Sequence, residues 1–277
     1  MLLHKPLTVT PCSPNIGAEI SDIDLTRPLE ADQVQQLHEA MAEHLVLFFR
    51  DQHIDFAAHR ALAEHFGKLH THVAGDGTNS KALDDDPTIR KFHFDENSES
   101  VSGELWHTDQ SVAPIPPMGS ILYLHTVPPR GGGDTLFASM YAAYDALSDR
   151  MKACLTGLTA VHDGRLAYAT TATNNLPIST HPLIARHPVT GKKLIYFTAA
   201  VVTKINGLPE LESKALIAFL TEHCAHPDFQ FRFRWQPHSI AFWDNRCVHH
   251  RAIWDYYPHT RSGYRIQISG TQPPIPA

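Results

Sequence analysis

Residues 231–269, FRFRWQPHSIAFWDNRCVHHRAIWDYYPHTRSGYRIQIS, form the strand-rich last third of the chain. Apolar and aromatic runs of strand length occur at Phe231 to Trp235, Ile240 to Trp243 and Tyr264 to Ser269, and turn-forming residues separate them. Strands dominate this part of the chain, which favours an antiparallel β-sandwich or barrel.

Helices are predicted to pack outside these strands. Val34, Leu37 and Met41 recur at helical spacing and lead into an apolar run from Leu45 to Phe49 with the length of a buried strand. Asp55 can cap a second helix. Two more strands and two more helices are expected at Ile121 to Val127, near Ser139, around Leu194 to Phe197, and where Leu216, Phe219 and Leu220 face inward. The fold is therefore mainly β with flanking helices, in a single domain over residues 1–277.

Two polar stretches interrupt this pattern. Residues 73–103 are rich in Gly, Asn, Ser and Asp, and residues 164–181 show little apolar periodicity. Loops of this length in compact domains are usually lids or binding loops, so both stretches are predicted to cover a site.

Composition excludes several classes of partner. The formal net charge is −6 and the basic residues form no stripe, which argues against nucleic acid. The apolar runs are too short for a signal core or a membrane span, so a cytoplasmic protein is expected. Four cysteines stand far apart without a CxxC pair, and are expected to be free thiols. A homo-oligomer is left open.

His-x-Asp pairs are candidate metal ligands, because alternate side chains of an extended segment share a face. The pattern occurs four times, so most occurrences are accidental. Asp55 is better explained as a helix cap, and Asp228 by a turn after a helix. His107-Thr108-Asp109 differs because Trp106 precedes it and a buried strand and a Gly131-Gly132-Gly133 turn follow.

Around these residues the chain resembles the taurine dioxygenase family, which includes alkylsulfatases and aryloxyalkanoate dioxygenases. The similarity extends from Gly17-Ala18-Glu19-Ile20 to Ile268-Ser269-Gly270 and is strongest in WDNRCVHH, residues 243–250, with Arg261 and Arg265 beyond it. The resemblance implies a double-stranded β-helix (jelly-roll) core, and Fe(II), 2-oxoglutarate and O2 as cofactor and co-substrates.

The resemblance also implies the metal and co-substrate ligands. The distal ligand falls seven residues after Trp243, on His250 rather than His249. With His107 and Asp109 it completes a facial triad of two histidines and one carboxylate. Arg261 inherits the bidentate contact with 2-oxoglutarate, and Thr135 donates to the same carboxylate.

Substrate contacts are implied for a further set of residues. Arg265 shares a strand face with Arg261, while Tyr264, Ile266 and Ile268 face the opposite way. Arg265 is expected to read a substrate anion, with a structural salt bridge as its alternative role. The other candidates are His72 or His70, Gln110, Val112 and Tyr196.

The pocket is expected to be wider than a taurine pocket. Gly103, Val112 and Gly164 replace larger side chains of taurine-cleaving relatives, which favours a longer anion. Asp244 and Asn245 are assigned a turn and no chemistry.

The implied reaction is hydroxylation of a small organic anion, such as a sulfonate, a sulfate ester or an aryloxyalkanoate, with release of succinate and CO2. A metal-dependent hydrolase leaves Thr135 and Arg261 without a purpose. A non-enzymatic anion-binding β-barrel does not require His107, Asp109 and His250 together.

Overall fold

The computed structural model describes residues 6–74, 80–168 and 176–277. A large sheet runs through its centre and contains eight strands. In spatial order these are β1 (Thr8–Pro11), β2 (Ala18–Ser21), β3 (Val46–Phe49), β14 (Ser239–Asp244), β6 (Gly119–Thr126), β16 (Arg261–Ile268), β5 (Asp86–Phe94) and β4 (Lys81–Leu83). Their neighbours pair antiparallel, except β2 and β3, which are parallel.

Three smaller sheets of three strands each accompany it. The first contains β13 (Gln230–Phe233), β7 (Thr135–Ser139) and β15 (Val248–Ala252). The second contains β12 (Val202–Ile205), β8 (Thr159–Asp163) and β9 (Ile178–Pro182). The third contains β11 (Lys193–Ile195), β10 (Ile184–Arg186) and β17 (Ile275–Pro276). The chain is therefore mainly β.

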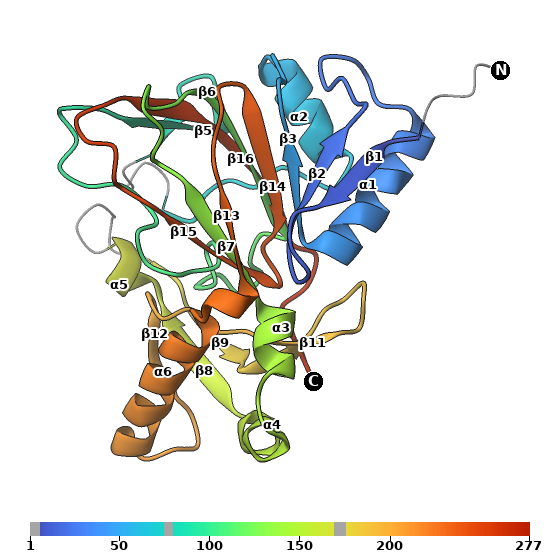
Figure 1. Cartoon of the computed structure of the whole chain (residues 1–277). Coiled ribbons are helices and arrows are strands. Elements are labelled where there is room, and N and C mark those ends of the chain that lie inside the picture. The colour runs from blue at the N-terminus through green and yellow to red at the C-terminus, as the bar shows by residue number, and fades with distance from the viewer. Residues whose placement is uncertain (1–5, 75–79, 169–175) are drawn as a thin grey trace.

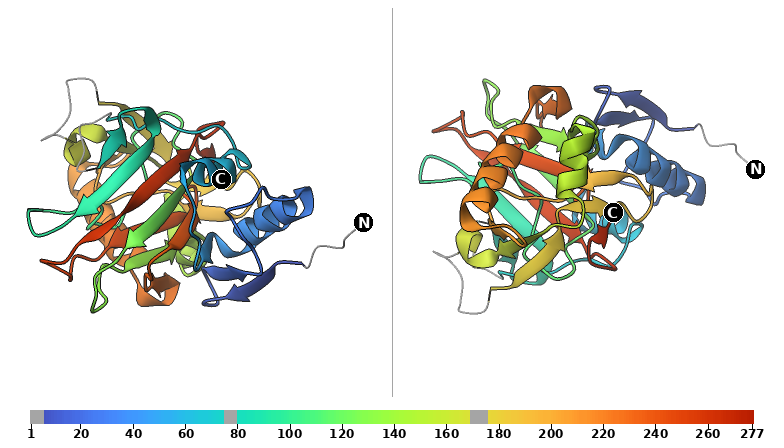
Figure 2. Two further views of the ribbon diagram at one scale, coloured as in Figure 1. Left: turned by 90° about the horizontal axis from the view of Figure 1, so that it is seen from above. Right: turned by 90° about the horizontal axis from the view of Figure 1, so that it is seen from below.

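The helices lie at the margins of these sheets (Figure 1). They are α1 (Ala31–His44), α2 (Phe56–Glu64), α3 (Met140–Asp145), α4 (Asp149–Leu155), α5 (Gly164–Tyr168), α6 (Glu210–Cys224) and the short 3-10 helix η1 (Pro227–Phe229). Seen from below in Figure 2, α3 and α6 lie in front of the strands. Asp55 caps α2 with its side chain, as the sequence predicts, and α3 starts near Ser139 as expected, with the Ser139 side chain as its cap. Within the described ranges, no helix is long and apolar enough to span a bilayer.

Strand β3 separates the two parts of the hydrophobic core. Val46 and Phe48 belong to one cluster, which includes Phe137 of β7 and Trp243 of β14. Leu47 and Phe49 point to the other side, into a cluster that packs under α1 and α2. Burial of each phenylalanine contributes about 1.5–3 kcal/mol, so a strand buried on both faces anchors the sheet.

The structure corrects the extent of the two predicted lids. Residues 73–103 were expected to be loop, yet they contain β4 and the nine residues of β5, which pairs with β16 in the large sheet. Buried Arg90, whose Nε donates to Ser80 Oγ at 3.1 Å, interrupts the apolar pattern that marks a strand. Residues 164–181 likewise contain α5 and the start of β9. Residues 75–79 and 169–175 of the predicted lids lie outside the described parts.

A smaller correction concerns α6. Its inward side was expected to carry Leu216, Phe219 and Leu220. Leu220 is buried, but Phe219 is exposed, because the residues that α6 buries are Ser213, Leu220 and Cys224.

Candidate metal and co-substrate site

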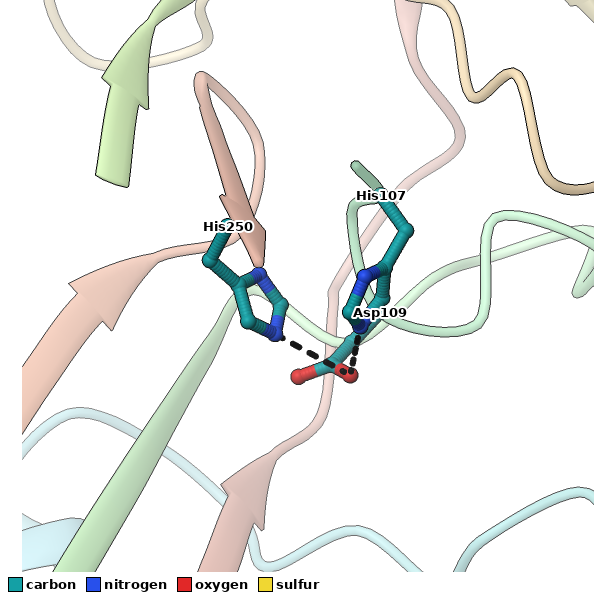
Figure 3. A group of neighbouring side chains, drawn as sticks. All are labelled: His107, Asp109 and His250. Atoms are coloured by element: carbon teal, nitrogen blue, oxygen red, sulfur yellow. Dashed lines mark ion pairs between the residues drawn. The ribbon is translucent and has the colours of Figure 1, made fainter. Parts of the chain in front are cut away.

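His107, Asp109 and His250 meet beside β15, as Figure 3 shows. Strand β15 carries His250, and the backbones of His107 and His250 form an isolated antiparallel bridge with N···O distances of 3.1 and 2.8 Å. His107 Nε2 lies 3.9 Å from Asp109 Oδ1, and His250 Nε2 lies 3.8 Å from the same oxygen. One ligand atom from each residue falls within 4.8 Å of the others, so a single cation can contact all three.

The protonation of the two histidines suits a metal. His107 Nδ1 donates to Leu105 O at 2.7 Å, which leaves the lone pair of Nε2 for a ligand bond. Burial lowers the pKa of His107 below its ordinary value. Burial and the charge of His107 hold the pKa of His250 well below that value. Both rings are therefore neutral near pH 7, as metal binding requires.

Asp109 supplies the negative charge of the cluster. Burial acts to raise the pKa of the Asp109 carboxyl. Arg265, the two histidines and Ser120 together lower that pKa by more than burial raises it, so the net shift is downward. Arg265 Nη1 donates to Asp109 Oδ1 at 3.1 Å, and Ser120 Oγ donates to Oδ2 at 2.6 Å. A carboxylate with these partners stays ionised in a buried site. The role of Ser120 was not predicted, since a serine on β6 carries no sequence signal.

His249 lies outside the cluster, as its alternation with His250 predicts. It is buried, and burial lowers its pKa to about 3. The structure thus groups His250, not His249, with the His-x-Asp pair.

Arg261 and Thr135 lie close to each other beyond the triad. Trp235 Nε1 donates to Thr135 Oγ1 at 3.0 Å, and the Arg261 guanidinium lies 5.6 Å from the Trp235 ring centre. Arg261 Nε donates to Gly133 O at 3.0 Å. A Cβ at residue 133 would lie 2.8 Å from Arg261 Cδ, and Gly133 has a φ of +68°, so this contact requires glycine.

A cavity of about 430 Å³ opens onto His107 and Asp109. Arg265 and His72 contribute polar atoms to its wall, and Phe92, Val112 and Leu166 contribute apolar surface. His72 Nδ1 accepts from the Ala74 N–H at 3.1 Å, so its Nε2 carries the proton. Burial, followed by the charge of Arg265, lowers the pKa of His72 to about 2, so the ring is neutral.

Other predicted substrate residues are placed differently. His70 does not line the cavity, and its Nε2 lies 3.3 Å from Gln110 Oε1. Gln110 lines the cavity, but its side chain accepts from the Val73 N–H and donates to Gln267 Oε1. Tyr196 lines a separate cavity of about 510 Å³, because its ring packs against His162 and His181.

Gly164 is also absent from the cavity wall. A Cβ there would lie 2.9 Å from Pro177 O and 3.2 Å from Leu176 Cβ. The missing side chain is compensated by this neighbouring segment, so Gly164 does not enlarge the cavity.

A second buried group, His187, Asp244 and Cys247, has the spacing of metal ligands but the bonding of a structural hydrogen-bond network. His187 Nδ1 accepts from the N–H groups of Val189 and Thr190, so Nε2 carries the proton and donates to Asp244 Oδ2 at 3.0 Å. Burial raises the pKa of the Cys247 thiol well above its ordinary value. His187 therefore has no free lone pair and Cys247 no thiolate to offer to a metal.

A half-buried histidine, a buried histidine and a buried carboxylate beside an open cavity form the donor set of mononuclear non-haem Fe(II) oxygenases. Residues 8–267 match the model of the taurine catabolism dioxygenase TauD, TfdA family. The chain belongs to this family, and it is an Fe(II)- and 2-oxoglutarate-dependent dioxygenase.

Relatives with different substrates are about equally similar. The chain is 33% identical to an alkylsulfatase of Acinetobacter baylyi, over 92% of this chain and 82% of the relative. It is 31% identical to the alpha-ketoglutarate-dependent 2,4-dichlorophenoxyacetate dioxygenase of Cupriavidus pinatubonensis, over 89% and 92%. The crystal structure of a taurine dioxygenase from Burkholderia xenovorans superimposes with a TM-score of 0.84 at 33% identity, over 97% of this chain and 93% of that one.

Proposed function

We propose that His107, Asp109 and His250 hold Fe(II) at the mouth of the cavity. Each offers one ligand atom, and the neutral rings and ionised carboxylate suit a divalent cation. When bound with 2-oxoglutarate and O2, the iron supplies the oxidation, and the keto acid leaves as succinate and CO2. The chain contributes the positions of the ligands and of the substrate carbon.

Arg261 and Thr135 bind the distal carboxylate of 2-oxoglutarate. A planar guanidinium fits a carboxylate through two parallel hydrogen bonds. Trp235 helps to position both side chains. Its ring lies beside the Arg261 guanidinium, and its Nε1–H donates a hydrogen bond to Thr135 Oγ1. Burial lowers the pKa of Arg261, which still leaves the group cationic near pH 7.

Arg265 and the Nε2–H of His72 bind the anionic group of the substrate. The observation that carries this assignment is the position of Arg265 in the cavity wall. A cationic guanidinium at this position can donate charge-assisted hydrogen bonds to an anionic group. Phe92, Val112 and Leu166 then face the carbon skeleton. These contacts favour an alkyl or aryl sulfonate, a sulfate ester or an aryloxyalkanoate.

The strand arrangement supports a double-stranded β-helix core for this site. The large sheet and the β13-β7-β15 sheet enclose one hydrophobic cluster, and β15 and the segment before β6 bring the triad together. We propose a single domain over residues 1–277, with lid loops in the described parts of 73–103 and 164–181 outside β4, β5, α5 and β9. A homo-oligomer and a cytoplasmic location stay predictions.

Succinate formation across a substrate panel tests the proposal. Purified protein with Fe(II), 2-oxoglutarate and O2 should release succinate at the rate at which a sulfonate, a sulfate ester or an aryloxyalkanoate is consumed. Uncharged analogues of the same length, such as the matching alcohols, should give much slower turnover. Equal turnover of anion and alcohol would exclude the roles of Arg265 and His72.

A further inference from the structure

We propose that Asn245 is a positioning residue that holds the metal ligand Asp109 in register with His250. This inference rests on the proposed metal-binding role of the triad. Asn245 belongs to the turn between β14 and β15, for which the sequence indicated only a structural turn.

Asp109 needs an external support because it lies outside any strand. His107 is fixed by its backbone bridge to His250, but the chain leaves that bridge immediately afterwards. Gln110 has a φ of +50°, and the Ala113 N–H bonds to Gln110 O at 2.9 Å, so the segment turns sharply. No strand pairing therefore satisfies the backbone groups of Asp109.

The Asn245 carboxamide satisfies the backbone N–H and C=O of Asp109 instead. Its Oδ1 accepts from the Asp109 N–H at 2.7 Å, and its Nδ2 donates to Asp109 O at 2.8 Å. Nδ2 also donates to Pro117 O at 3.0 Å, and Thr108 Oγ1 lies 2.7 Å from Oδ1. Asn245 is 1% exposed, so no water replaces these bonds. Both N–H groups of the amide donate and Oδ1 accepts from the Asp109 N–H, which fixes the orientation of the amide.

The chain segment that follows Asn245 also carries His250. The Asn245 N–H donates to Met118 O at 2.9 Å, and five residues further along the chain β15 places His250 in the cluster. The turn that bonds the backbone of Asp109 thus leads directly into the strand that carries His250. A shift of Asp109 would move its carboxylate away from the two imidazoles, so metal affinity should depend on Asn245.

Mn(II) titration followed by electron paramagnetic resonance, without keto acid, separates this role from simple stabilisation. Asn245→Ala should weaken Mn(II) binding by about ten- to a hundredfold. The matched control is Gln52→Ala, because Gln52 is another buried carboxamide that accepts from one backbone N–H, of Leu25, and donates to two backbone carbonyls, of Ile23 and Arg50, remote from the triad. It should lower the melting temperature and leave Mn(II) affinity unchanged.

Asn245→Asp provides a second variant if the alanine protein does not fold. It keeps the shape but loses the donors to Asp109 O and Pro117 O. The added charge alone would strengthen cation binding, whereas our proposal predicts weaker binding. If both variants fold and both bind Mn(II) with wild-type affinity, the role of Asn245 is overturned. If only Asn245→Asp folds, wild-type Mn(II) affinity in that variant overturns it. Equal Mn(II) binding by wild type and His250→Ala overturns the triad instead, so the two failures are distinguishable.

Discussion

Arg265 Nη1 donates to Asp109 Oδ1 at 3.1 Å, so an arginine of β16 contacts the carboxylate oxygen that faces both histidines of the triad. Its guanidinium lies 4.9 Å from the Phe92 ring centre and borders the cavity. Arg265 thus contacts the proposed metal ligand and lines the cavity proposed for the substrate. The salt bridge considered from the sequence is present, and anion binding stays our proposal for the same side chain.

Arg265→Leu separates these two roles. Loss of the anion contact should raise the KM of an anionic substrate by about ten- to a hundredfold, the equivalent of a charged hydrogen bond of about 1.5–3 kcal/mol. Mn(II) affinity should change much less, because the three ligands remain. Steady-state kinetics beside metal titration measures both, and an unchanged KM with impaired metal binding would leave only the salt bridge.

Arg261→Lys tests the co-substrate site. The charge remains but the two-pronged contact is lost, so 2-oxoglutarate affinity should fall about ten- to a hundredfold, or about 1.4–3 kcal/mol. Thr135→Val should have a smaller effect. Arg232→Lys is the control, because Arg232 pairs with Asp134, just before β7. Anaerobic titration through the absorption of the iron–keto-acid chelate gives the constants, and equal binding by wild type and Arg261→Ala would refute the assignment.

The buried carboxylate of Asp244, which pairs with Arg246 and accepts from His187, should make the free energy of unfolding depend on pH. Burial acts to raise the pKa of Asp244, but Arg246 and His187 lower it more, so its folded-state pKa lies below the ordinary value of 3.8. The stabilisation is therefore complete above that value and is lost as the pH falls below it. Asp244→Asn should cost about 3–5 kcal/mol at pH 7, and less at pH 3. Urea unfolding at both pH values measures this, and a constant difference would contradict it.

Taurine should be a poorer substrate than longer anions. A cavity of about 430 Å³ with Val112 in its wall leaves apolar surface uncovered when the ligand is small. Gly103 offers no side chain to an amine, and a Cβ there would lie 3.0 Å from His107 Cε1. Competition kinetics with alkyl sulfonates, sulfate esters and aryloxy acids decides the order. The wider-pocket argument fails if taurine has the highest kcat/KM with tightly coupled succinate formation.

The sequence predicts the triad well because its information is local. The alternation of side chains puts His107 with Asp109 and separates His250 from His249, and the structure groups the residues accordingly. The strand face shared by Arg261 and Arg265 is recognisable in the same way, since Ile266 and Ile268 enter the opposite core cluster.

Contacts between distant segments of the chain leave no local pattern in the sequence. The pairing of Arg265 with Asp109 joins residues 156 positions apart, and no local pattern announces it. The sequence predicts a lid in place of strand β5 because the buried Arg90 interrupts the alternation of apolar residues that would indicate a strand. Tyr196 was placed in the substrate pocket, but tertiary packing against His162 turns it toward another cavity.

Metal titration of the triad variants tests the central claim most directly. His107→Ala, Asp109→Ala and His250→Ala should each abolish tight Fe(II) or Mn(II) binding and succinate formation, because one lost ligand ruins a three-ligand site. His249→Ala should bind metal nearly as well as the wild type, since its ring lies outside the cluster. Retained metal binding in His250→Ala, with loss in His249→Ala, would contradict the account.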